Sequence, residues 1–408
     1  MAIDIAQALI DAGKKYKKEL LAMPVAALAE VFPFLTVVTG VQGKIIGGIL
    51  STDAQLRPYR TAKGESDGTK IEAFEWETFL GDVVKEFDPN ALLGSLYTEL
   101  TATKANETQI AKRVALEMAK KVGEALFDNL FTAIRNGAGN YTADLFNGYS
   151  TLIKAQVNAG NLTLAKKNYV DNSGVKITSD NAGDVLRAFW RGRSPLLKKL
   201  NVNLNIPTTV LEMYEDWFQV EYGHAPWNTG IEQKVLVGSG GKCTLVPFSN
   251  MEGQNFIFMT IKDNMKLGVD QMSDAETVEI RRVDNPKVVQ FFMKAYFGVG
   301  FETFDKTYFS AMKISLDPIA DLAKSAIAAT TATFTWTAAE DATSLKIQIS
   351  SDNGVTWADA THTAIAVDAA TKQITALVAE TTYKVRLIVV DGLNNGYSNV
   401  VTVTTSAA

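Results

Sequence analysis

The sequence predicts an α+β protein followed by a separate all-β domain at its C-terminus. Upstream of Asp317, helical and strand patterns alternate, whereas downstream the chain becomes a run of short strands rich in Thr, Ala, Val and Ile. In addition, 408 residues exceed what one hydrophobic core usually organises. We therefore place a domain boundary near Asp317 and Pro318.

The composition excludes several classes of protein. Apolar residues make up 47% and charged residues 21%, which is ordinary for a globular protein. The net charge of -5 gives no strong overall field, so nucleic-acid binding by a generally basic surface is not predicted. No stretch is long and apolar enough to predict a membrane span. The single cysteine, Cys243, excludes an intrachain disulfide.

The first hundred residues read as an arm followed by a hairpin. Residues 1–22 have the spacing of an amphipathic helix, and residues 31–50 suit an extended segment that lies on something else. The hairpin has predicted strands Ala54–Arg60 and Lys70–Phe79. Its tip, residues 62–69, is polar with two glycines, which is a strong turn signal.

The second strand of this hairpin is apolar on both sides. Phe74 and Trp76 share one side, and Ile71 and Ala73 share the other. A strand of this kind in a protruding hairpin needs a partner. That partner is either the hairpin's own domain or a neighbouring subunit.

A long helix is predicted from Asn106 to Asn136. Asn106 and Gln109 resemble a capping box, and Gly137 follows the predicted end. Such a helix would be about 45 Å long at roughly 1.5 Å per residue. Its apolar residues step by four, so the stripe drifts around the axis and different stretches should face different neighbours.

A mixed region and a core strand follow. Helices are predicted at Tyr149–Ala159, Asn181–Arg191 and Val210–Tyr222, and strands at Asn203–Ile206, Phe256–Thr260 and Val278–Val283. In a last strand, Lys287–Phe301, seven apolar residues fall on one face by period two. This alternation indicates a central core strand.

Motifs for enzymatic chemistry are missing from the sequence. There are two histidines, His224 in a predicted loop and His362 in the C-terminal domain, and a nucleophile would need one of them or another base nearby. Gly238–Cys243 resembles a phosphate-binding loop, but Leu236 and Cys243 break the required pattern. We read it as a turn between strands. We expect no catalytic site, metal or cofactor.

The order of these elements resembles the major capsid proteins of tailed bacteriophages with the Hong Kong 97 fold. The closing segment VEIRRVDNPKVVQFFMKAYFGVGFETFDKTYF contributes to this likeness. The resemblance implies a capsid domain over residues 1–315. Its implied parts are an N-arm 1–50, an E-loop 51–85, a spine helix 104–137, an axial domain 140–275 and a peripheral sheet 276–312.

The segment from 316 to 408 resembles a fibronectin type III, immunoglobulin-like domain. Trp336 matches the core tryptophan of an early strand, and Leu377, Thr381 and Tyr383 match the tyrosine corner. The usual proline of this corner is Ala379 here. Asp352-Asn353-Gly354 is predicted to form a hairpin turn, because Asn-Gly supplies positive φ angles.

The resemblance implies a non-enzymatic shell subunit that forms pentamers and hexamers around a DNA genome, without sequence-specific DNA binding. Its E-loop residues, Arg57, Tyr59, Phe74 and Trp76, would contact a neighbouring subunit. It implies assembly in the host cytoplasm, a place in the virion, and portal, scaffold or decoration proteins as partners. A host-surface glycan is a further candidate partner of the C-terminal domain. The alternatives are a tail or baseplate protein, or a secreted carbohydrate-binding enzyme.

Overall fold

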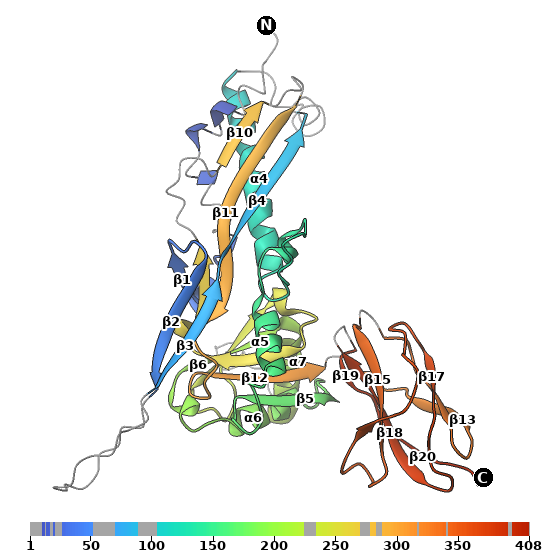
Figure 1. Cartoon of the computed structure of the whole chain (residues 1–408). Helices are drawn as coiled ribbons and strands as arrows, with labels where there is room; N and C mark the ends of the chain where they lie inside the picture. The colour runs from blue at the N-terminus through green and yellow to red at the C-terminus, as the bar shows by residue number, and fades with distance from the viewer. Residues whose placement is uncertain are drawn as a thin grey trace, which may run out of the picture. The chain divides into compact units, whose positions relative to one another are not determined.

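The computed structural model describes twelve ranges of the chain: residues 10–12, 14–16, 19–20, 27–51, 70–88, 104–223, 234–269, 278–282, 288–315, 318–339, 342–390 and 394–407. The chain forms two compact units, each built from two separate segments. The first unit is Met1–Ala155 with Ile261–Phe304, and the second is Gln156–Thr260 with Asp305–Ala408. The predicted boundary near residue 316 therefore falls inside the second unit. Figure 1 shows the elements of both units.

The first unit is organised around one long strand, β11 (Val289–Phe301). Its sheet also contains β1 (Thr36–Thr39), β4 (Phe79–Phe87), β9 (Met265–Val269) and β10 (Val278–Arg282). The first part of β11 pairs with β10 on one side and β4 on the other, and its last part pairs with β9. β1 joins the outer side of β9 in parallel. The predicted central strand is confirmed.

The core of this unit lies between the sheet and the helix α4 (Lys104–Asp128). Val289, Phe291 and Met293 are buried from β11, and they cluster with Ala115 and Ala119 of α4. Two alanines at spacing four let the helix approach the strands closely. Ala12 and Leu20 belong to the same cluster, and described residues around them are helical.

Helix α4 ends at Asp128, eight residues before the predicted end. The following segment folds back on the chain: the backbone N–H of Ile134 donates to the carbonyl of Ala143, and that of Gly148 donates to the carbonyl of Ala133. Gly148 allows this approach, because a Cβ there would lie 2.5 Å from the backbone of Phe131. Helical propensity past Asp128 is thus overridden by tertiary hydrogen bonds. At 25 residues, α4 is about 38 Å long.

The hairpin base differs from the predicted one. β3 (Lys70–Glu77) pairs with β2 (Lys44–Ser51), which the sequence placed in an extended arm. The ladder runs from Lys44 opposite Glu77 to Ser51 opposite Lys70, and the predicted strand Ala54–Arg60 lies outside the described residues. The predicted strand Lys70–Phe79 is interrupted at Thr78, whose hydroxyl donates to the carbonyl of Val41 and accepts from the N–H of Gly43. The chain passes from β3 into β4 at this point.

The second unit contains a mixed sheet of five strands in the order β5-β12-β8-β6-β7. Their bounds are Tyr169–Lys176, Phe309–Ser315, Phe256–Thr260, Val202–Pro207 and Cys243–Phe248. β8 is antiparallel to both of its neighbours, whereas β5 and β12 form one parallel pair and β6 and β7 another. All strands except β8 therefore start at the same edge of the sheet.

The predicted helices of this region are confirmed within a few residues. They are α5 (Tyr149–Asn158), α6 (Ala182–Arg191) and α7 (Thr208–Tyr222). Gly183 lets α6 approach α7, because a Cβ there would lie 2.0 Å from the ring of Trp217. Short 3-10 turns occur at Phe32–Phe34, Thr142–Asp144, Leu197–Lys199, Ser249–Met251 and Lys262–Asn264.

The C-terminal part of the second unit is a two-sheet β-sandwich. One sheet holds β13 (Ala323–Ile327), β14 (Ala332–Thr335) and β17 (Thr371–Ile374). The other holds β15 (Ser344–Ser350), β16 (Ala358–Asp359), β18 (Thr382–Val390), β19 (Gly396–Tyr397) and β20 (Val401–Thr404). Phe334 and Ile374 from the first sheet share one core with Ile347, Val385 and Leu387 from the second. Along β18 every second residue is buried, so one face of this strand packs into the core.

Candidate assembly surfaces

Trp76, for which the sequence predicts contact with a neighbouring subunit, is buried within its own unit. Its side chain is 6% exposed. It lies against Gly268 and Gly300: a Cβ at either position would come within 2.5 Å of the Trp76 side chain. The sequence did not reveal this, because Gly268 and Gly300 lie 192 and 224 residues further along the chain. Arg57 and Tyr59 lie outside the described residues, as does the side chain of Phe74.

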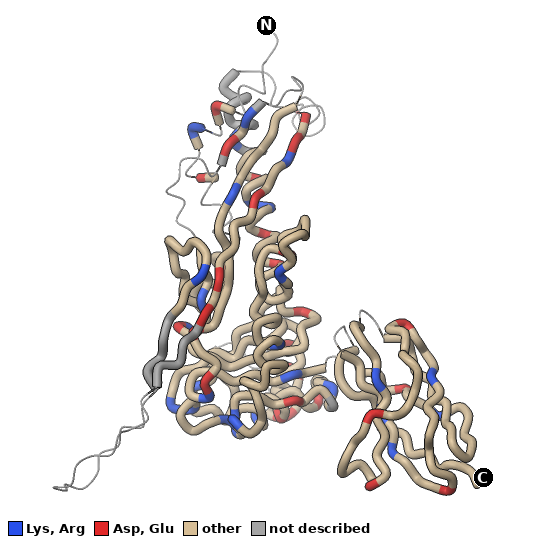
Figure 2. The backbone as a smooth tube through the Cα atoms, viewed as in Figure 1, with Lys and Arg blue, Asp and Glu red and all other residues tan. Residues whose placement is uncertain are grey.

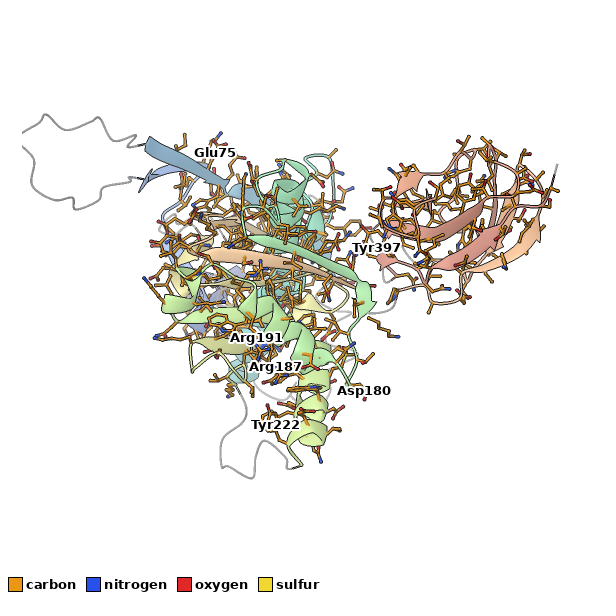
Figure 3. The ribbon with its side chains drawn as sticks, turned by 90° about the horizontal axis from the view of Figure 1, so that it is seen from below. Glu75, Asp180, Arg187, Arg191, Tyr222 and Tyr397 are labelled. Atoms are coloured by element: carbon orange, nitrogen blue, oxygen red, sulfur yellow. The ribbon has the colours of Figure 1, made fainter. Side chains whose placement is uncertain are left out.

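The ribbon formed by β2 and β3 exposes a mixed surface. Ile46 is 69% exposed. Lys44 forms ion pairs with Glu75 and, at 3.8 Å, with Glu77 across the ladder. Figure 3 labels Glu75 on this ribbon. Exposed ion pairs of this kind contribute little to stability. The exposed apolar side chain of Ile46 is therefore the feature of the ribbon that favours a covering surface.

The face of the first sheet formed by alternate residues of β4, β11 and β10 exposes further apolar groups. We call it the outer sheet face, and it consists of Leu80, Asp82, Val84, Glu86, Gln290, Phe292, Lys294, Tyr296, Glu279 and Arg281. Leu80 and Val84 are 51% and 45% exposed. They stand opposite Tyr296 and Phe292, which are only partly buried.

A polar network crosses the same face. Gln290 donates from Nε2 to Glu86 Oε1 at 3.0 Å, and its Oε1 accepts from Arg281 Nε at 2.8 Å. These bonds connect all three strands. The outer sheet face thus combines exposed apolar side chains with polar groups that already have partners, as protein interfaces do.

The residues predicted for the tyrosine corner lie at one corner of the sandwich. Trp336 and Leu377 are buried in its core, with Tyr383. The backbone N–H of Val378 donates to Tyr383 Oη at 3.2 Å. Thr381 donates its backbone N–H to Thr405 Oγ1 and its hydroxyl to the carbonyl of Ala379. The corner is therefore fixed by side-chain bonds to backbone groups without the usual proline.

The predicted turn at Asp352-Asn353-Gly354 is confirmed. Asn353 has φ +61° and Gly354 has φ +93°. Asp352 accepts hydrogen bonds from the hydroxyl of Ser350 and from the hydroxyl and backbone N–H of Thr356. These donors hold the pKa of the Asp352 carboxyl well below its ordinary value.

The two histidines considered for chemistry are placed only in part. His362 is half-buried, with Nδ1 2.8 Å from the carbonyl oxygen of Thr363, and His224 lies outside the described residues. Gly238, Gly240 and Gly241 have positive φ in a turn before β7. Cys243 is buried, which raises the pKa of its thiol to about 12. Among the described residues, no three His, Cys, Asp or Glu side chains are grouped so as to hold a metal ion.

A buried arginine was missed by the sequence reasoning. Arg193 is almost fully buried and donates from Nε to the carbonyl of Phe189 and from Nη1 to Ser310 Oγ at 2.9 Å. Burial lowers the pKa of its guanidinium to about 10. It connects the end of α6 to β12. No local pattern distinguishes it from the exposed Arg191 two residues earlier.

None of the helices in the described part of the chain is long and apolar enough to cross a bilayer. Comparison of the sequence with family models and with curated proteins finds no match.

The structure is similar to several solved capsid structures at low identity. One is titled satellite phage P4 procapsid including size determination (Sid) protein, at 12% identity and TM-score 0.43, covering 74% of this chain and 99% of that one. The cyanophage A-1(L) capsid asymmetric unit has 12% identity, TM-score 0.44 and coverages of 72% and 92%. A structure titled Mycobacterium phage Adephagia has 13% identity, TM-score 0.43 and coverages of 71% and 91%.

Proposed function

We propose that this chain is the structural subunit of an icosahedral phage capsid that self-assembles into pentamers and hexamers around a DNA genome. The observation that carries the proposal is the exposed apolar surface of the first unit. Ile46 on the ribbon and Leu80 and Val84 on the outer sheet face lie on strands that each pair with one neighbouring strand. Exposed apolar surfaces of this kind are typical of sites that other protein chains cover.

The two-stranded ribbon supports the same function. Among the described residues β2 and β3 pair only with each other, and an isolated two-stranded ribbon is marginally stable in water. Trp76 anchors its base in the first unit. Contact with a neighbouring subunit would stabilise the remainder, including the segment with Arg57, Tyr59 and Phe74. The role is structural, and no enzymatic step is assigned to it.

We further propose that the sandwich is an immunoglobulin-like, fibronectin type III domain exposed on the shell. The bond between Val378 and Tyr383, five residues apart at a strand entrance, supports this family assignment. A host-surface glycan is its proposed ligand. In the virion, portal, scaffold or decoration proteins would be further partners of the shell subunit, which would assemble in the host cytoplasm.

The test is electron microscopy of the purified full-length chain. We expect closed, uniform shells or sheets of hexamers. A chain that stays monomeric at concentrations well above micromolar would refute the function. Removal of residues 316–408 tests the sandwich separately: full-sized particles that retain unchanged binding to host-surface glycans would refute the adhesion role.

A further inference from the structure

Basic residues line one edge of the mixed sheet in the second unit. Because β5, β12, β6 and β7 run in the same direction, the residues that precede each of them lie along one edge. Each of these strands is preceded by an exposed lysine. We call this set the basic row: Lys166, Lys167, Lys199, Lys242 and Lys306. Neighbouring strands lie about 4.8 Å apart, so the row extends across roughly 19 Å.

Within the described residues, no side chain of the basic row forms an ion pair with a carboxylate. The amino group of Lys166 donates to the carbonyls of Gly160 and Asn161, and that of Lys242 donates to Asn201 Oδ1. Asp305 is the acidic residue closest in sequence to the row, and its Oδ1 accepts from the N–H of Thr307. The positive charge of the row therefore remains available to a partner.

Acidic residues follow the ends of β5 and β6, one before α6 and two along α7. Asp180 lies between the end of β5 and α6, and α7 begins directly after the last residue of β6. Along α7, Glu212, Asp216 and Val220 follow at spacing four, so they share one face of the helix, and all three are exposed. We call Asp180, Glu212 and Asp216 the acidic stripe. None of the three has an ion-pair partner in the part of the chain that the structure describes.

The two charged surfaces occupy different places on the unit. Helix α6 runs from the strand-end edge back to the strand-start edge, and Figure 3 labels Asp180 before its first turn and Arg191 at its last. Figure 2 shows how the charged residues are distributed over the chain. A six-residue strand such as β6 extends about 20 Å, so Asp180 lies at the edge opposite the basic row. Glu212 and Asp216 lie on the exposed side of α7, whose buried Tyr214 accepts at Oη from the N–H of Val237.

Each surface also exposes apolar side chains. Leu164 and Leu196 lie near the basic row in sequence, and both are exposed. Val220, at the end of the acidic stripe, is 79% exposed. A surface that combines charged with apolar side chains is typical of contact with a folded protein. Binding to the phosphates of a nucleic acid requires positive charge but no apolar side chains.

We propose that the basic row of one copy of this chain docks on the acidic stripe of the next copy, so that the subunits join head to tail into rings. This inference rests on the proposed function, since it specifies how capsomer rings form. Two complementary surfaces on different sides of one molecule make a heterologous contact, which closes into a ring when the rotation per copy permits. Charge complementarity orients the copies and disfavours the reverse contact, because like charges would then meet.

Charge reversal on each side tests the pairing. The first variant carries Lys199→Glu and Lys242→Glu, and the second carries Glu212→Lys and Asp216→Lys. All four side chains are exposed, so the subunits should fold, as checked by circular dichroism and thermal melting. We expect each variant to raise the protein concentration needed for assembly by at least about tenfold, measured by light scattering and electron microscopy. A variant with Lys324→Glu and Lys372→Glu on the sandwich is the matched control and should assemble normally.

The decisive variant combines all four substitutions. At the four substituted positions the charges are again opposite, with the signs exchanged, so assembly should return to within about threefold of the wild-type threshold. When the two double variants are mixed, six-membered rings in which they alternate should form, because the four positions are then all acidic in one variant and all basic in the other. A five-membered ring cannot alternate, so closed shells are not expected from the mixture.

Several results would overturn the inference. Loss of assembly that the combined variant does not restore would show that the two surfaces do not meet. Normal assembly of the first variant with less protected nucleic acid inside the particles would identify the basic row as a phosphate-binding surface. Normal assembly of both double variants would also refute the pairing while leaving the proposed function intact. A wild-type chain that never assembles would refute the proposed function itself.

Discussion

Replacement of Trp76 by alanine should destabilise the subunit itself. Burial of a tryptophan removes about 150–250 Å² from water, which corresponds to roughly 4–6 kcal/mol at about 25 cal/mol per Å². That figure is an upper bound, and large-to-small core substitutions of aromatic residues cost about 3–5 kcal/mol. Gly268 and Gly300 have no side chains that could move into the space. We therefore expect Trp76→Ala to lower the free energy of unfolding by about 4 kcal/mol.

The assay is urea denaturation of unassembled subunits followed by far-ultraviolet circular dichroism. Trp76→Phe is the control, and it should lose less stability because an aromatic ring still fills most of the site. A loss below about 1 kcal/mol, together with failure to assemble, would refute the reasoning. It would mean that Trp76 acts between subunits, as the sequence first indicated.

Three further outcomes follow from the second unit. Tyr383→Phe removes the acceptor of the Val378 N–H and should cost about 1 kcal/mol of sandwich stability in thermal melts, and no change would argue against the corner bond. Arg193→Ala should cost about 2–4 kcal/mol in urea denaturation, because the Phe189 carbonyl and Ser310 lose a buried donor, and a neutral result would contradict that role. The lowered pKa of Asp352 contributes stability that is complete above its ordinary value of 3.8 and is lost as the pH falls. Asp352→Asn should therefore flatten the acid-side decline of the urea midpoint, and identical pH profiles would disprove this contribution.

Local patterns predicted three helices and two strands between residues 149 and 260. Helices α5, α6 and α7 and strands β6 and β8 lie within about three residues of their predicted bounds, an error typical of element ends. The alternation along β11 predicted a central strand, because one buried face of a strand is visible in the sequence alone.

Features that depend on distant contacts were not predictable. The end of α4 is set by backbone hydrogen bonds from Ile134 and Gly148, which the spacing of apolar residues in the sequence does not predict. The same limit applies to the ribbon: β2 has its glycine pair, Gly47 and Gly48, within a strand, so its composition favoured an irregular arm. The exposure of Leu80 and Val84 depends on which face of the sheet α4 covers.

The first unit is formed by two segments that are far apart in the sequence, and this affects folding during translation. Phe79 at the start of β4 pairs with Phe297, so at about 5–20 residues per second a ribosome needs roughly 10–45 s between the two partners. Throughout that delay α4 and β4 lack the central strand that covers their apolar sides. The nascent polypeptide thus emerges with the apolar sides of α4 and β4 uncovered, and its yield in a crowded cell should depend on chaperones that hold it until translation nears residue 300.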